Sequence, residues 1–238
     1  MSSTTTRQSD NALQDLIDLA EDGIAACEGG DYPRAVALLD AALGLADERD
    51  VEPGLIATLC NELGMACKYA GEWDAGETAL RRALALITEL HGETSEEVAG
   101  ICHNLGGLFR ASGRWHDAEP WARRAVEVRQ ACNGDQFALV QDRAALAPIL
   151  QELGRLDEAE SLMTTALPFY EQQLGPDHLE VGYVLSNLGT VALDRDDLAS
   201  ATVHLQRALQ IKQQWLGHDH PSTQITQRNL TRAQPDGA

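Results

Sequence analysis

The chain has 238 residues, of which 44% are hydrophobic and 23% are charged, and its formal net charge is −19. This acidic balance argues against a protein that binds nucleic acid backbones, because such proteins need clustered positive charge. Only 5% of the residues are aromatic, so the core must consist mainly of Leu, Ala and Val, which favours packed helices over sheets.

The polar N-terminus has no apolar segment of the secretory-signal kind, and no apolar run approaches the ~20 residues that span a bilayer. We therefore expect a cytoplasmic protein that contacts no membrane. Residues 1–10 and 233–238 lack a periodic apolar face, which predicts disorder at both ends. The cysteines are sparse and include no CxxC pair, so we expect reduced thiols at Cys27, Cys60, Cys67, Cys102 and Cys132.

Four series of residues recur along the chain at steps of 41 or 42. A small residue, usually after Leu, and a turn residue form two of them: Gly23, Gly64, Gly106, Ala147 and Gly189, and Gly30, Gly71, Gly113, Gly154 and Asp196. The others are Ala42, Ala83, Ala125, Ala166 and Ala208, and Gly92, Gly134, Gly175 and Gly217. Self-similarity at a fixed period is the signature of a repeat architecture built from one supersecondary unit.

Each repeat unit is expected to be an antiparallel pair of helices. The small residue after Leu lets the two helices approach closely, and the turn glycine suits the left-handed position that ends the first helix. A large side chain follows two residues later and starts the second helix. On the outer side, Glu77–Arg81 and Glu119–Arg123 are expected ion pairs between residues four positions apart.

In chain order, the apolar periodicity predicts helix pairs at 11–28 and 32–48, 52–70 and 73–90, 95–112 and 115–132, 136–153 and 156–174, and 178–195 and 198–215. A further helix at 221–232 is expected to cap the array. The repeats have approximate bounds of 11–50, 51–92, 93–134, 135–175 and 176–217, within a single domain at 11–232. Pro148 and Pro168 predict kinks inside their helices, and Asp196 predicts the loosest turn.

The segments GRWHDAEPWARRAVEV (113–128), GRLDEAESLMTTAL (154–167) and LGPDHLEVGYVLSNLGTVAL (174–193) resemble the tetratricopeptide repeat family, specifically its kinesin-light-chain type with 42-residue repeats. They share its Leu-Gly pair in the first helix, its Gly-x-aromatic turn and its two small residues in the second helix. The resemblance covers about 11–232. It implies an all-α, right-handed superhelical solenoid of five helix pairs and a capping helix, with the first helices on the concave face.

The same resemblance implies a binding site on that concave face. Asn recurs there, although it is a poor residue inside a helix. Either a hydrogen bond between adjacent repeats or an amide offered to a bound peptide backbone accounts for it. In the kinesin-light-chain type the matching row contacts peptide, which gives as candidate groove residues Asn61, Met65, Lys68, Tyr69, His103, Asn104, Gly107, Arg110, Gln151, Tyr183, Ser186, Asn187, Thr190 and Arg228.

No catalytic or phosphate-binding motif is present in the sequence, so we expect no catalytic residue and no cofactor. His218 and His220 lie in an inter-repeat loop without further ligands nearby, and no metal is expected. Chaperone-binding relatives hold a terminal carboxylate with Lys and Arg at two positions of the first helix. Those positions here are Asn, His, Ala and Ser, and Met, Gly, Pro and Thr, which argues against such a clamp.

These observations predict a non-enzymatic scaffold that binds a protein or peptide segment in the groove, as a monomer or weak homo-oligomer. The negative net charge favours a partner with basic residues, because it speeds the association of the two molecules. It argues against a nucleic acid partner. The alternative is a small-molecule sensor or an unusual enzyme that uses His103 and Arg110 in a central pocket.

Overall fold

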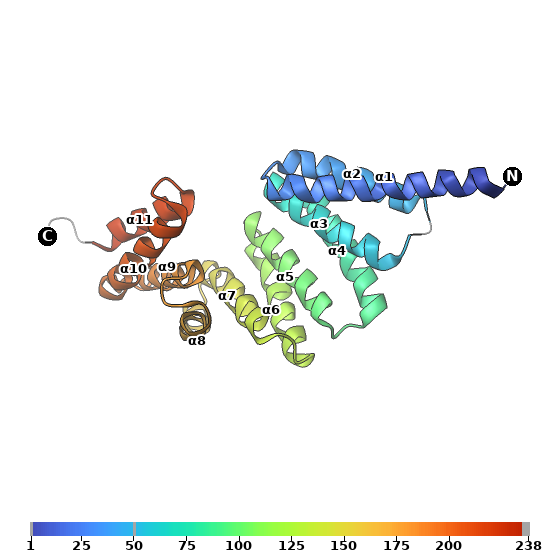
Figure 1. Ribbon diagram of the computed structural model, residues 1–238. Coiled ribbons are helices and arrows are strands. Elements are labelled where there is room, and N and C mark those ends of the chain that lie inside the picture. The colour runs from blue at the N-terminus through green and yellow to red at the C-terminus, as the bar shows by residue number, and fades with distance from the viewer. Residues whose placement is uncertain (1, 50, 235–238) are drawn as a thin grey trace. The chain divides into compact units, whose positions relative to one another are not determined.

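The computed structural model describes residues 2–49 and 51–234, and side chains from residue 13 onward. All regular structure in this described part is α-helical, and successive helices form the predicted antiparallel pairs (Figure 1). The helices are α1 (Ser2–Glu28), α2 (Tyr32–Asp47), α3 (Pro53–Ala70), α4 (Trp73–His91), α5 (Glu96–Ala111), α6 (Trp115–Ala131), α7 (Gln136–Glu152), α8 (Leu156–Leu174), α9 (Leu179–Asp194), α10 (Leu198–Leu216) and α11 (Pro221–Ala233).

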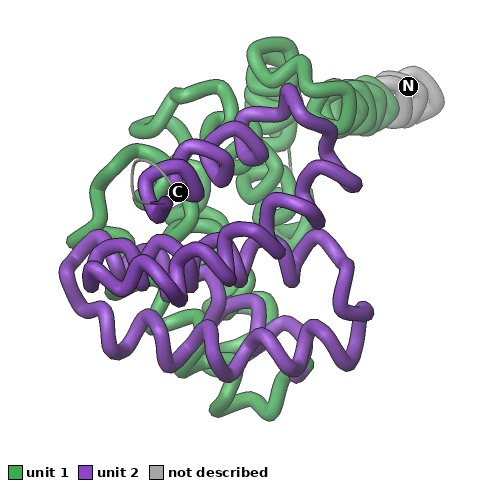
Figure 2. The backbone as a smooth tube through the Cα atoms, turned by 90° about the vertical axis from the view of Figure 1, so that its left-hand side faces the viewer, with its two compact units in different colours: residues 1–135 green, residues 136–238 purple. Residues whose placement is uncertain are grey.

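The chain divides into two compact units, Met1–Asp135 and Gln136–Ala238 (Figure 2). In unit 1 the first helices of successive repeats, α1, α3 and α5, contact one another in turn. In unit 2 the first helices α7, α9 and α11 do the same. The side chains expected in the groove therefore lie along two separate rows, one in each unit, and the single domain over 11–232 stays a prediction.

The two ends of the chain differ from the sequence prediction. Helix α1 begins at Ser2, ahead of the predicted start at residue 11, while the side chains of residues 1–12 lie outside the described part. The predicted disorder of residues 1–10 stays a prediction. At the other end, Ala233 belongs to α11 and is only 1% exposed, so the expected tail cannot begin there. Residues 235–238 lie outside the described residues.

Small residues bring the two helices of a pair together, as the repeat pattern predicts. A Cβ atom added at Gly64 would lie 2.5 Å from Cγ of Leu80, and one added at Gly189 would lie 2.5 Å from Cγ of Leu205. Real Cβ atoms do not approach other carbons so closely, because interiors are already packed at crystal-like density. Glycine at these positions is therefore required by the crossing of each first helix with its own partner.

The turn inside each pair is left-handed. The glycines at this position have φ between +74° and +82°, and Asp196 takes the same conformation with φ of +58° (Gly30, Gly71, Gly113, Gly154 and Asp196). A side chain is strained in this region, whereas glycine is not. The predicted role of the turn series is confirmed. Helices α7 and α8 continue through Pro148 and Pro168, and the expected kinks there stay a prediction.

Ion pairs form on the second helices of the repeats, α4 and α6. The predicted pairs Arg81–Glu77 and Arg123–Glu119 are present, each with 2.8 Å between nitrogen and oxygen. Arg114 also reaches back to Glu77 at 2.9 Å and so links neighbouring repeats. The side chains of these pairs are 20–49% exposed, and solvent screening limits each pair to a few tenths of a kcal/mol.

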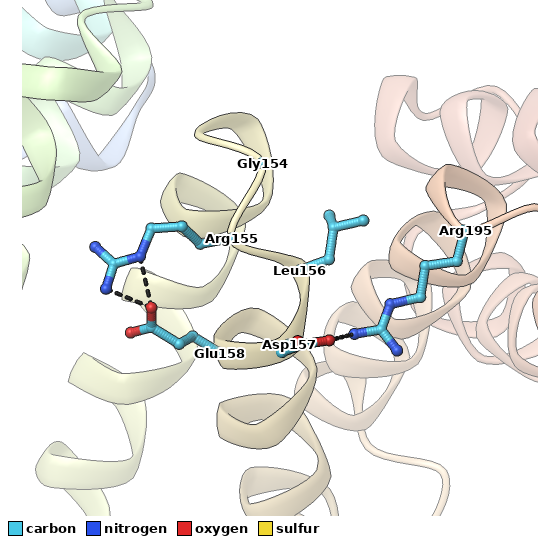
Figure 3. A pocket seen from close by; sticks show the side chains of 6 residues that line it. All are labelled: Gly154, Arg155, Leu156, Asp157, Glu158 and Arg195. Carbon is cyan, nitrogen blue, oxygen red and sulfur yellow. Dashed lines mark hydrogen bonds and ion pairs between the residues drawn. The ribbon is translucent and has the colours of Figure 1, made fainter.

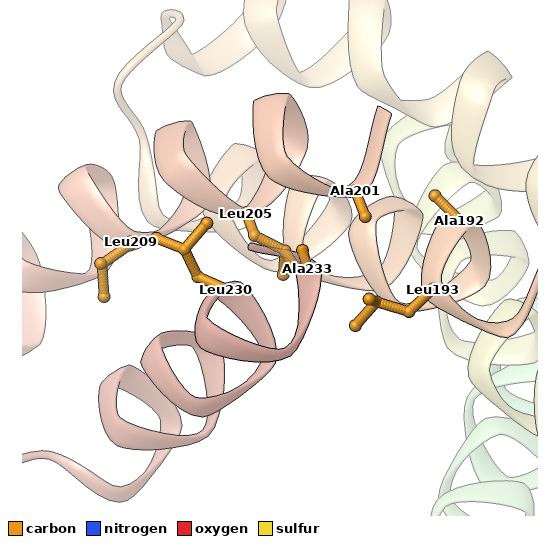
Figure 4. Close-up of a cluster of buried hydrophobic side chains, with 7 residues drawn as sticks. All are labelled: Ala192, Leu193, Ala201, Leu205, Leu209, Leu230 and Ala233. Carbon is orange, nitrogen blue, oxygen red and sulfur yellow. The ribbon is translucent and has the colours of Figure 1, made fainter. Parts of the chain in front are cut away.

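Helix α11 closes an apolar cluster in unit 2 (Figure 4). Leu230 and Ala233 of α11 pack against side chains from α9 and α10, and all members of the cluster are at least nine-tenths buried. The remaining members are Ala192, Leu193, Ala201, Leu205 and Leu209. The last helix thus covers apolar surface of the preceding pair, as its predicted capping role requires.

Candidate functional site

The Asn row forms a hydrogen bond between adjacent repeats in unit 1. Nδ2 of Asn104 on α5 donates to Oδ1 of Asn61 on α3 at 2.8 Å, and Nδ2 of Asn61 donates to Glu62 at 3.3 Å. Both amides are half-buried. This contact supplies the structural reason for Asn at these positions. It uses only part of the hydrogen-bonding capacity of the two amides, since each has two N–H groups and a carbonyl oxygen.

A hollow of about 240 Å³ lies beside this Asn pair, between α3 and α5, and Ile87 of α4 also lines it. A Cβ atom added at Gly100 would meet no other group within 4 Å, so the α5 side of the hollow is open. His103 and Arg110 do not line it. Its lining residues are Ala57, Thr58, Asn61, Ile87, Glu97, Gly100, Ile101 and Asn104.

Two cations lie further along the same pair of helices. Lys68 of α3 is half-buried, and burial together with the nearby charge of Arg110 on α5 lowers the pKa of Lys68. Neither side chain has a carboxylate partner in the described part of the chain. Gly107 lets the Lys68 ammonium lie close to the α5 backbone, because a Cβ atom there would be only 3.3 Å from Nζ of Lys68.

Aromatic rings border these cations on one side. Nζ of Lys68 lies 4.9 Å from the ring centroid of Tyr69, which is 56% exposed. Tyr69 in turn stacks on Tyr32 at the start of α2, with 4.9 Å between ring centroids. Four predicted groove residues of unit 1, namely Lys68, Tyr69, Gly107 and Arg110, are therefore brought together in one place. We call this the Lys68–Arg110 cluster. Met65 and His103 are half-buried on the same two helices.

The candidate residues of unit 2 are mostly occupied by bonds within the protein. Gln151 donates to Asp194 at 2.7 Å and accepts a hydrogen bond from Thr190 at 3.1 Å. The hydroxyl of Thr190 also donates to the backbone carbonyl of Asn187 at 2.9 Å. Gln151 and Thr190 are thus brought together, but their polar groups hold α7 against α9 and are less available to a ligand than those of unit 1.

Ser186 is not on the surface, contrary to the sequence prediction. It is 6% exposed, and its Oγ lies 3.1 Å from Oγ1 of Thr226 on α11. Thr226 also accepts a hydrogen bond from Nζ of Lys212 at 3.0 Å, and that ammonium lies 4.9 Å from the ring centroid of Tyr183. Ser186 therefore belongs to a buried polar network and cannot make the predicted contact with a bound segment, whereas Tyr183 is half-buried beside this network.

Lys212, which lies at the centre of this network, is not among the functional residues predicted from the sequence. The side chain is only 3% exposed, and burial lowers its pKa to about 8. A signal was present, because Lys212 stands at the repeat position that Ile87 and Tyr170 occupy in other repeats. Arg129 stands at the same position of the third repeat and is also buried, so the register is not uniformly apolar. A charged residue at a position that Ile or Tyr holds in other repeats indicates a buried polar contact, although the register alone does not identify the groups that surround it.

A hollow between the turns of α7–α8 and α9–α10 carries charges that are already paired (Figure 3). Arg155 is paired with Glu158, and Arg195 is paired with Asp157 across the hollow. Arg195 also contacts Glu160 at 2.8 Å. Because these charges are already paired within the protein, they are less available to a ligand. This hollow is therefore a weaker candidate binding site than the α3–α5 surface of unit 1.

The loop histidines cap helices. Nδ1 of His178 accepts a hydrogen bond from the backbone N–H of Glu180 at 3.2 Å, and Nδ1 of His220 accepts one from Ser222 at 3.1 Å. They satisfy backbone donors at the first turns of α9 and α11. Within residues 2–49 and 51–234, no cluster of three metal-ligating side chains is found. The helices described in the structure include none long and apolar enough to cross a membrane.

The sequence profile of the tetratricopeptide repeat matches residues 54–131 and 142–214, more than half of the chain. No curated protein matches the sequence. Among solved structures, the chain is similar to BtubC (BKLC) from P. vanneervenii, with 22% identity, a TM-score of 0.68, and 91% of this chain and 93% of that one covered. It is also similar to the TPR-like repeats assigned to a kinesin light chain of Podosopora anserina, with 15% identity, a TM-score of 0.70, and 84% and 95% covered.

A third similar structure is YrrB, described as a TPR protein with an unusual peptide-binding site. The identity is 19% and the TM-score 0.55, with 96% of this chain and 98% of that chain covered. At such low identities the three likenesses concern the fold alone.

Proposed function

Because the chain belongs to the tetratricopeptide repeat family, as its sequence predicts, we propose that it is a non-enzymatic interaction scaffold that binds an extended protein segment along the α3–α5 surface of unit 1. Repeat proteins of this kind bind partners on the face that their stacked first helices form. YrrB, which shares the fold, is described as having a peptide-binding site. The α3–α5 surface joins the Asn pair, the hollow beside it and the Lys68–Arg110 cluster.

The observation that carries this proposal is the Lys68–Arg110 cluster itself. The chain has 37 acidic and 18 basic residues, yet Lys68 and Arg110 lie together without a carboxylate partner among the described side chains. Burial of the Lys68 ammonium, together with the nearby charge of Arg110, costs free energy and lowers the pKa of Lys68. A carboxylate from a bound segment would offset that cost with charge-assisted hydrogen bonds.

The local chemistry therefore refines the partner class. The net charge of −19 favours encounter with basic partners at long range, as the sequence suggests. At the site, however, the unpaired groups are cationic, so the bound segment presents an Asp or Glu side chain to Lys68 and Arg110. The amides of Asn61 and Asn104 and the adjacent hollow receive the backbone and a small side chain of the same segment.

Selection of binding peptides from a random 12-residue library tests the proposal. We expect the selected peptides to be enriched in Asp and Glu. The double variant K68E/R110E should weaken their binding roughly tenfold or more, the loss expected for a charge-assisted contact. The matched control R34E/R124E makes the same change of charge elsewhere in unit 1 and should alter binding less than about twofold.

Two results would contradict the proposal. Selected peptides without acidic enrichment would show that the cluster does not recognise a carboxylate. Equal losses in K68E/R110E and R34E/R124E would show that binding depends on the net charge alone and not on the α3–α5 surface.

A further inference from the structure

A further cavity lies in unit 2 between α10 and α11, whereas the surface proposed for protein binding belongs to unit 1. Its volume is about 470 Å³, which is within the range of small-molecule sites. Leu209, which belongs to the apolar cluster shown in Figure 4, is one of the residues that line this cavity. The other lining residues are polar: Gln213, His218, Thr223, Gln224, Gln227 and Arg228.

Thr223 is the most informative of these residues. Its side chain is 2% exposed, and in the described part of the chain its Oγ1 is the one buried side-chain oxygen or nitrogen without a hydrogen-bond partner. Almost all buried hydroxyls in native proteins are satisfied, because leaving one unpaired costs free energy. Thr226, one turn along α11, is satisfied by Ser222, Lys212 and Ser186. Thr223 is one of the residues that line the cavity, so a group bound there is the candidate partner for its hydroxyl.

The cavity is also cationic in an acidic protein. Arg228 and His218 line it, and no carboxylate does. Arg228 has no ion-pair partner within residues 13–49 and 51–234. The ammonium of Lys212 is buried nearby, where it donates to Thr226 on the same helix as Thr223 and Arg228. The positive charges of Arg228 and Lys212 favour an anion in the cavity over a neutral ligand or a cation.

We propose that this α10–α11 cavity binds a small organic molecule through a carboxylate group. The guanidinium of Arg228 holds the carboxylate, since Arg and carboxylate groups match in shape and charge. The hydroxyl of Thr223 donates the hydrogen bond that it lacks in the free protein. The amides of Gln213, Gln224 and Gln227 bind further polar groups of the ligand, and Leu209 contacts its carbon skeleton.

Thermal unfolding with named probes tests this assignment. Citrate is the carboxylate probe, inorganic phosphate is the second probe, and NaCl at equal ionic strength corrects for general screening. We expect citrate to raise the melting temperature beyond the NaCl control, because a ligand that binds only the folded state stabilises it. R228Q and T223V should abolish this increase. R232Q, an equivalent change on the same helix outside the cavity, should retain it.

T223V supplies a readout that needs no ligand. Valine has nearly the same shape as threonine but no hydroxyl, so without citrate the variant should melt at or above the temperature of the wild type. A lower melting temperature would show that the hydroxyl is already satisfied in the free protein and would overturn the proposal. So would an increase with citrate that is no larger than with NaCl, that persists in R228Q, or that only phosphate produces.

Discussion

The left-handed turn between α9 and α10 places a residue with a side chain where the other repeats have glycine. Asp196 has φ of +58°, and its counterparts Gly71 and Gly113 have φ of +82° and +74°. A non-glycine residue in this region costs about 1 kcal/mol, although Asp tolerates it better than most. The turn of this repeat therefore carries backbone strain that the glycine turns of the other repeats avoid.

Replacing that residue should stabilise the protein. We expect Asp196→Gly to raise the free energy of unfolding by about 0.5 to 1 kcal/mol, as measured by urea denaturation, since relief of strain exceeds the extra entropy of the unfolded chain. Gly154→Asp makes the reverse change at the equivalent turn and should destabilise by a similar amount. If both variants unfold like the wild type, the turn stores no strain.

The Asn pair allows a second test at the residue scale. Asn104→Ala removes the donor that Asn61 uses and leaves a half-buried carbonyl oxygen with only water as a partner. We expect a loss of about 0.5 to 1 kcal/mol in unfolding free energy. Binding of the selected acidic peptides should also weaken after correction for the folded fraction. Unchanged stability together with weaker binding would mean that the Asn–Asn bond contributes nothing to the fold.

Buried Lys212 makes stability depend on pH. Its pKa is about 8 in the folded protein, below the ordinary value of 10.5, because burial disfavours the charged form. Between these two values the unfolded chain binds more protons than the folded one, so stability rises with pH. Below pH 8 both states are protonated and the cost of burying the charge is fully present. We expect an increase of about 2 kcal/mol between pH 7.5 and 9.5.

Urea denaturation of the wild type and Lys212→Met across this range measures the effect of that one group. Methionine keeps the length and apolar character of the side chain but does not titrate, so the variant should lose most of the increase. Other titrating groups contribute equally to both proteins and cancel in the difference. Identical pH profiles would show that the ammonium is not desolvated in the folded state.

At the scale of helices, the sequence predicts the fold closely. The ends of α2 to α11 fall within one residue of their predicted positions, because turn glycines and the large residues that follow them mark each boundary. What the pattern does not predict is contact between helices distant in sequence. The Ser186–Thr226–Lys212 network joins α9, α10 and α11, and its members look like unrelated polar residues in the one-dimensional sequence.

The candidate site was predictable in part for the same reason. Repeat register placed Lys68 and Arg110 at matching positions, and the structure brings them together because α3 and α5 are adjacent. The repeat register also predicted that Ser186 is exposed. That prediction is wrong, because α11 covers the part of α9 that carries Ser186. The orphan hydroxyl of Thr223 could not be predicted at all, since it depends on the absence of a hydrogen-bond partner in three dimensions.

Helix α11 should account for much of the stability of unit 2. Leu230 is 6% exposed within the cluster with Leu205 and Leu209. Leu230→Ala should therefore lower the free energy of unfolding by about 2 to 4 kcal/mol, through lost burial and the cavity that it leaves. Ile225→Ala on the same helix removes a side chain that is 47% exposed and should cost less than about 1 kcal/mol. Similar effects of the two changes would show that α11 does not cover the cluster.

At the scale of the whole molecule, the net charge and the charge of the proposed site have opposite signs. The chain carries −19 overall, yet Lys68 and Arg110 lie together on the α3–α5 surface where an acidic segment is proposed to bind. Long-range repulsion acts on the approach of such a segment, whereas contact with Lys68 and Arg110 acts only after it arrives. Association and dissociation should consequently respond differently to salt.

This separation gives a kinetic prediction for the selected acidic peptides. Raising the salt concentration from about 20 mM to 200 mM shortens the screening length from roughly 20 Å to 7 Å. Repulsion by the whole chain is then largely screened, so the association rate should rise, while the dissociation rate also rises because the contact with the cluster weakens. Stopped-flow measurements of both rates at several salt concentrations test this. An association rate that falls as salt is added would mean that the cluster, and not the net charge, governs the encounter, because its attraction would then extend beyond contact.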